Sequence, residues 1–180
     1  MAHVWKVLRF ILIVIMVLFL APWLVSAVYG QTVNAAGESD IQVEAADPSA
    51  APSAQFFGKA IGSVTAGDLF YIDATDNPQD ISVSLYITNA DELIHYLRYL
   101  ILKVAVYFED KEGQWTKTLL ADGSEFRDTY ITLQNSPVNL PLPGYARYKI
   151  TIASGCFYCL SAGYNGSDFT PRFYLDVEPL

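Results

Sequence analysis

Apolar and polar side chains alternate with a period of two along most of the chain beyond residue 55. This period is typical of a β-strand that has one buried face. The longest alternating rows cover residues 81–88, 100–109, 145–152 and 172–177, and shorter ones cover residues 55–64, 69–74, 115–120 and 129–134. The pattern therefore predicts seven or eight short strands.

Turn-forming residues separate these rows, because glycine, proline, asparagine and aspartate favour tight changes of chain direction. The turns fall at Gly67-Asp68, Asn77-Pro78, Glu112-Gly113, Asp122-Gly123 and Pro143-Gly144. Short strands that alternate with turns at this spacing predict an all-β fold, an immunoglobulin-like or related antiparallel β-sandwich. We assign this sandwich to residues 56–180.

One interruption of the strand pattern has helical features. Asn89 is followed three residues later by Glu92, the spacing of a capping box, and Leu93 and Leu97 then recur at helical spacing. The sequence predicts a short helix from Ala90 to Leu97 that crosses from one sheet to the other.

The N-terminal segment, residues 1–30, has the pattern of an export signal. Lys6 and Arg9 precede the apolar run Phe10–Tyr29, an order that places the remaining chain outside the cytoplasm. A cleaved signal peptide, with small residues around Ala27 or Ala35, and an uncleaved single transmembrane anchor both fit this run. We expect an extracytoplasmic protein, secreted or membrane-anchored, with the membrane as a partner if the segment stays attached.

Residues 31–55 are rich in alanine, serine, proline and acidic residues, and they include few branched apolar side chains. A segment of this composition buries too little apolar surface to offset the entropy lost on ordering. We therefore expect a disordered linker between the export segment and the sandwich.

Charge is as unevenly distributed as hydrophobicity. All nineteen Asp and Glu residues lie from Glu38 onward, and the net charge of the chain beyond the export segment is about −10. A surface this negative repels the phosphate backbone of nucleic acids. We therefore exclude nucleic acid as a partner.

Groups able to catalyse a reaction are scarce in the sequence. His95 is the one imidazole beyond the export segment, so any Ser–His or Cys–His arrangement would have to use it. It falls in the predicted crossover helix, where an exposed position is the ordinary expectation. We predict no catalytic residues, no cofactor and no enzymatic activity.

Cys156 and Cys159 form a Cys-x-x-Cys motif. A structural disulfide would suit an oxidising compartment, but residues three apart in a straight strand are ~10 Å apart, beyond the ~7 Å limit for a disulfide. The bond therefore requires a turn at Phe157-Tyr158. Free thiols and a redox or metal-binding pair are the alternatives to the predicted disulfide.

Two features suggest ligands. Asp73, Asp76, Asn77 and Asp80 place oxygen-bearing side chains close together in the sequence, a pattern that calcium favours and that an ordinary solvated turn also has. Trp115 follows the Gly113-Gln114 turn and offers a ring on which a sugar could stack.

These features favour a non-enzymatic exported or cell-surface module that acts in interaction or assembly. The predicted long strand Tyr99–Glu109 would pair between molecules if it lay at a sheet edge, so a protein partner or self-association follows. The alternative is an extracytoplasmic ligand-binding module for carbohydrate or calcium, with Trp115 or the Asp73–Asp80 turn as the site.

Overall fold

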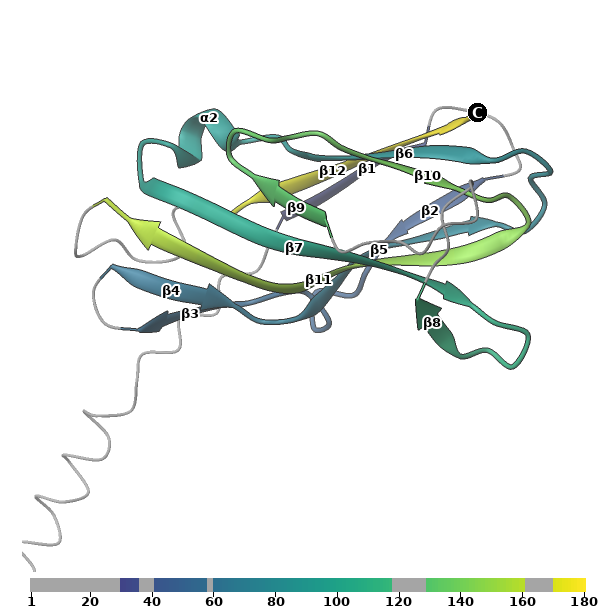
Figure 1. The fold of residues 1–180 in the computed structure, drawn as a ribbon, viewed down its shortest axis with the longest axis horizontal. Helices are drawn as coiled ribbons and strands as arrows, with labels where there is room; N and C mark the ends of the chain where they lie inside the picture. The colour runs from purple at the N-terminus through teal and green to yellow at the C-terminus, as the bar shows by residue number, and fades with distance from the viewer. Residues whose placement is uncertain (1–29, 36–40, 58–59, 118–128, 161–169) are drawn as a thin grey trace, which may run out of the picture.

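The computed structural model describes residues 30–35, 41–57, 60–117, 129–160 and 170–180, which form two packed β-sheets (Figure 1). The apolar run Phe10–Tyr29 lies outside the described residues, and the export segment stays a prediction. Within the described ranges, no helix combines the length and apolarity needed to cross a membrane.

The smaller sheet has four strands, and its strand order is β1-β12-β6-β10. The parallel pair β1–β12 is the exception in a sheet that is otherwise antiparallel. The bounds of these strands are Gly30–Ala35 for β1, Arg172–Pro179 for β12, Ile81–Ile87 for β6 and Val138–Leu142 for β10.

The larger sheet has eight strands and is organised around β11, which pairs with β7 along one edge and with β5 and then β4 along the other. The outer partners are β2 on β5, β3 on β4, and β8 and β9 on β7. The bounds are β2 Gln42–Ala45, β3 Ala54–Phe57, β4 Ile61–Val64, β5 Gly67–Ala74, β7 Leu97–Glu109, β8 Trp115–Lys117, β9 Thr129–Thr132 and β11 Ala146–Cys159.

The core lies between the two sheets. Every second residue of β6 is buried, and the facing strands of the larger sheet contribute Phe70, Ile150 and Leu102, which are fully buried. Burying a side chain of this size contributes ~1.5–3 kcal/mol. The predicted all-β sandwich is confirmed in its coarse form: two sheets, nearly all antiparallel, with almost no helix.

More strands are present than the alternation predicts. The prediction missed β10, whose Val138, Leu140 and Leu142 are buried and alternate with Asn139 and Pro141. Proline argues against a central strand because it donates no ladder hydrogen bond. It is tolerated here because β10 ends the strand order of the smaller sheet.

The prediction of a disordered linker at residues 31–55 is wrong for the described part of that segment. β2 pairs with β5, placing Val43 opposite Ile72, and the side-chain hydroxyls of Ser53 and Thr65 are 2.9 Å apart. The backbone ladder supplies the hydrogen bonds that offset ordering. These hydrogen bonds depend on strand pairing, so they cannot be predicted from the composition of the segment.

The predicted helix is shorter than expected, because α2 spans only Ala90–Leu93 and β7 already begins at Leu97. The capping box does not form, since the Asn89 side chain makes no cap hydrogen bond. Its amide instead donates to the Thr170 carbonyl (2.9 Å) and accepts from the Arg172 backbone N–H (2.9 Å). Asn89 therefore joins the end of β6 to the start of β12.

Strand β7 is not a sheet edge, which corrects the expectation that it pairs between molecules. It lies between β11 on one side and β8 and β9 on the other. Ala105, in its middle, is 3% exposed. Its backbone groups are therefore occupied within the molecule over most of its length.

Candidate functional site

The outer face of the larger sheet carries a cluster of aromatic and charged side chains, which we call the aromatic-ionic cluster. Strand registers align all its members except Asp68 in two rows that run across β5, β11, β7 and β8, and Asp68 lies in the next row, opposite Thr151. The cluster consists of Asp68, Tyr71, Asp73, Tyr107, Glu109, Trp115, Arg147 and Lys149. These residues are far apart in sequence and come together only because β11 is paired on both edges.

Arg147 is held between two carboxylates. Its Nε lies 3.1 Å from Asp73 Oδ2, and its Nη1 donates to Glu109 Oε2 at 2.8 Å. Partial burial of Asp73 raises its pKa, but hydrogen bonds from Thr75 and the Arg147 guanidinium outweigh it, and the pKa lies below its ordinary value. The Asp73 carboxylate is thus charged near neutral pH.

Lys149 lies among aromatic rings in the neighbouring row. Its Nζ is 5.3 Å from the centroid of the Trp115 ring and 5.6 Å from that of Tyr107. The rings of Trp115 and Tyr71 are 5.9 Å apart and tilted by 51°. Cation–π attraction within ~6 Å stabilises such a group, so the ammonium holds the rings in place.

A β-bulge brings Asp68 into the cluster. The register between β5 and β11 shifts at Ile150/Thr151, so Asp68 faces Thr151 where a regular strand would turn it inward. Its carboxylate accepts hydrogen bonds from the Tyr71 hydroxyl (2.8 Å) and the Thr151 hydroxyl (3.0 Å), and it lies 3.4 Å from Lys149 Nζ. Burial, followed by the Asp68 contact, raises the pKa of Tyr71 to about 12, so its hydroxyl remains a donor.

A depression of about 160 Å³ lies beside Trp115 on this face. Arg147 and Asp73 line it together with Tyr71 and with Glu44 from β2. Pockets that enclose a small molecule are typically ~300–1,000 Å³. The depression is therefore too small to enclose one, and it suits contact with part of an extended molecule, to which it offers ring surface, carboxylate oxygens and guanidinium N–H groups.

The residues predicted as a calcium site do not converge. Asp73 binds Arg147, and Asp80 accepts the Gly144 backbone N–H (3.3 Å). The buried Asn77 donates to the Gln79 carbonyl (2.8 Å), and Asp76 is exposed. No group of three or more His, Cys, Asp or Glu side chains among the described residues is placed to hold a metal ion. The loop instead packs against the Pro143-Gly144 turn.

The predicted disulfide is wrong, because both cysteines are free. Strand β11 continues without a turn from Ala146 to Cys159, so the sulfurs lie on opposite faces of the sheet. Cys156 is exposed on the outer face, whereas Cys159 is 1% exposed beneath it. Burial raises the pKa of the Cys159 thiol, which further lowers its reactivity.

We expect alkylation of the native protein to modify Cys156 alone. Cys159 should react only after unfolding, because its thiol is buried and stays protonated. Intact mass after treatment with a maleimide, with and without guanidinium, measures this difference. Modification of both cysteines in the native state, or of neither, would contradict the placement of the two side chains.

His95 is exposed, as expected, but it lies in the turn between α2 and β7 and not in a helix. The sequence also singled out Trp115 and, as a possible calcium ligand, Asp73, but it missed the other members of the cluster. A sequence feature that indicates two of these members is present in β11, where Arg147 and Lys149 alternate with the buried Tyr148 and Ile150. Such alternation shows that Arg147 and Lys149 share the outer face of a strand. It does not show which side chains of the neighbouring strands lie beside them.

Comparisons with known proteins leave the family undetermined. No protein-family model and no curated protein matches this sequence. Similar solved structures include the family 32 carbohydrate-binding module from Streptococcus pneumoniae EndoD (TM-score 0.26, 12% identity, covering 72% of this chain and 75% of that one). They also include the xylan-binding domain from Paenibacillus barcinonensis Xyn10C (TM-score 0.25, 13% identity, covering 86% and 92%). At such TM-scores the likeness supports no statement about ligands.

Proposed function

We propose that this chain is an extracytoplasmic ligand-binding module that binds carbohydrate on the aromatic-ionic cluster. The observation that carries the proposal is the placement of Trp115 and Tyr71 around Lys149, beside the depression lined by Asp73 and Arg147. Aromatic rings offer apolar faces to sugar rings, while fixed ionic groups accept and donate hydrogen bonds to sugar hydroxyls.

The cluster is preorganised for such contacts. Arg147 is held by two carboxylates, and Lys149 is held by Asp68 and by two rings. Because these side chains are already ordered, ligand binding would lose little conformational entropy in immobilising them. An extended polysaccharide lying across the strands would contact several of them at once, which fits the small volume of the depression.

The same geometry argues for binding without catalysis. Glycoside hydrolysis needs one carboxyl whose pKa is raised so that it can act as an acid. In the cluster, Asp73 and Glu109 both contact the Arg147 guanidinium, and the pKa of Asp73 lies below its ordinary value. We therefore propose a non-enzymatic module.

We expect Trp115→Ala to weaken binding to soluble polysaccharides by about tenfold or more, the equivalent of ~1.4 kcal/mol. Trp115 is the largest ring of the cluster and contacts both Tyr71 and Lys149. Affinity electrophoresis against neutral and acidic polysaccharides would first identify a binding partner, and titration calorimetry would then compare the variants.

Tyr130→Ala is the matched control. Tyr130 is a 51% exposed ring on β9, on the same sheet but outside the cluster. Its removal should leave binding unchanged. The proposal fails if no polysaccharide binds to the wild-type protein, or if Trp115→Ala and Tyr130→Ala bind as tightly as it does.

A further inference from the structure

One end of the sandwich brings together the start of β1 and the start of β7. Gly30 pairs with Arg172, which is bonded to Asn89 immediately ahead of α2. The chain then passes through α2 to β7. On the outer face of the larger sheet, the last row at this end places Phe57, Ile61, Tyr158 and Tyr99 side by side on β3, β4, β11 and β7.

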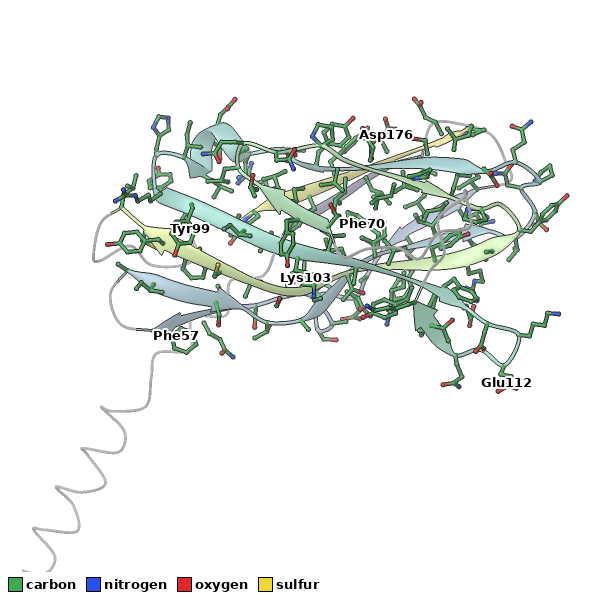
Figure 2. The ribbon with its side chains drawn as sticks, viewed as in Figure 1. Phe57, Phe70, Tyr99, Lys103, Glu112 and Asp176 are labelled. Carbon is green, nitrogen blue, oxygen red and sulfur yellow. The ribbon has the colours of Figure 1, made fainter. Side chains whose placement is uncertain are left out.

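This end exposes an unusual set of large apolar side chains, which we call the apolar end. Tyr99 and Phe57 lie toward this end in Figure 2, and Glu112 lies at the opposite one. The exposed fractions are 63% for Phe57, 49% for Ile61, 45% for Ile94, 38% for Tyr99 and 54% for Leu160. Strand registers make the row from Phe57 to Tyr99 contiguous, and an exposed contiguous apolar surface marks an interaction site.

Net negative charge is concentrated at the end of the sandwich opposite the apolar end. At the apolar end the exposed cations Arg98 and Arg172 balance the exposed acids Asp91 and Glu92 of α2. At the other end carboxylates outnumber cations among the described residues, and they come from the β5–β6 and β7–β8 turns and from the strand ends beside these turns. They include Asp73, Asp76, Asp80, Glu109, Asp110 and Glu112. An anionic surface would therefore repel one end far more than the other.

We propose that the apolar end contacts the surface of a lipid bilayer. The apolar run Phe10–Tyr29 ends one residue before Gly30, and one residue spans at most ~3.6 Å. If that run lies in a membrane, the start of β1 is held at the bilayer surface. Tyrosine favours the lipid–water interface, and Tyr99 and Tyr158 lie in the outermost row, with ring centroids 6.1 Å apart.

This orientation also determines where the aromatic-ionic cluster lies relative to the bilayer. Trp115 and Glu109 lie at the far end of β7 from Tyr99, because β7 runs the length of the sheet. With the apolar end on the bilayer, the aromatic-ionic cluster lies at the end of the sandwich that is far from it. The lipid contact is independent of the proposed carbohydrate site, and it would hold even if the cluster bound no carbohydrate.

The free thiol of Cys156 allows a direct test, because it is exposed one row inside the Tyr158 row. The full chain, labelled there with a fluorophore, is reconstituted into vesicles of phosphatidylethanolamine and phosphatidylglycerol that contain headgroup spin-labelled lipid. The comparison carries the label at the far end, as Gln114→Cys combined with Cys156→Ser. We expect quenching to be several-fold greater at position 156. If the chain is isolated in a processed form, that form is added to the same vesicles, with the same expectation.

A substitution at the surface separates lipid contact from mere proximity. Ile61→Glu should reduce quenching at position 156 several-fold, whereas Tyr145→Glu, which changes an exposed ring outside the apolar end, should not. Thermal melting checks that each variant is folded. Equal quenching at positions 156 and 114, or quenching that Ile61→Glu leaves unchanged, overturns the proposal. So does a concentration-dependent dimer in light scattering that is lost in Ile61→Glu while quenching stays low, because a second copy would then be the occupant.

Discussion

Replacing Asn89 with alanine is expected to lower the free energy of unfolding by about 2–4 kcal/mol, because two backbone groups would lose their partner. Asn89 is 7% exposed, and its amide bonds both the Thr170 carbonyl and the Arg172 N–H. These bonds join the end of β6 to the start of β12. Chemical denaturation of the wild type and of Asn89→Ala would measure the difference.

Asn139→Ala is the control for that change. Asn139 also accepts a side-chain hydrogen bond, from the Ser84 hydroxyl at 2.8 Å, but this pair is exposed and water can replace the lost partner. Its cost should stay within ~0.5 kcal/mol, as for most surface substitutions. Equal losses from Asn89→Ala and Asn139→Ala would show that the buried amide has no special role.

Replacing Gly62 with valine is expected to destabilise the protein by ~1–3 kcal/mol or more, as overpacking of a core does. Gly62 lies opposite Phe157 in the pairing of β4 with β11. A Cβ atom at Gly62 would overlap the Phe157 ring and approach the Gln55 carbonyl oxygen to 2.6 Å. Phe157 is 5% exposed, so its ring can move only by disturbing the core. The melting temperature should fall by several degrees.

Ser63→Val provides the comparison in the same strand. Ser63 faces outward, opposite Cys156, where the added methyl groups meet solvent. Valine favours strands, so stability should be unchanged or slightly higher. If Gly62→Val proves as stable as Ser63→Val, the close packing of the Phe157 ring on the β4 backbone is refuted.

Local periodicity determined much of the architecture. The alternation at residues 81–88 predicts β6, and that at residues 172–177 predicts β12, because a strand with one buried face has a period of two whatever its neighbours are. The turns predicted at Asn77-Pro78, Glu112-Gly113 and Pro143-Gly144 separate strands for the same local reason. Gly67-Asp68 instead begins β5, and Asp122-Gly123 lies outside the described residues. The all-β class and the two-sheet form therefore followed from the sequence.

Where local signals misled, contacts distant in sequence decided the outcome. Gln42–Ala45 is polar and short, yet it is a strand because β5 offers an unpaired edge. Asn89 has the spacing of a helix cap, but its side-chain amide oxygen accepts a hydrogen bond from the Arg172 backbone N–H instead. The Cys156–Cys159 segment stays extended because β7 pairs with it, with one register shift between Tyr158 and Cys159.

The candidate site also depends partly on local sequence and partly on contacts between distant strands. The sequence alone predicted that Trp115 follows a turn and that residues 145–152, which include Arg147 and Lys149, form a strand with one buried face. Only the tertiary structure placed Lys149 against the Trp115 ring and, through the bulge in β5, turned Asp68 toward it. The physical reason is that side-chain periodicity specifies the face of a strand, whereas strand pairing and register specify the neighbours on that face.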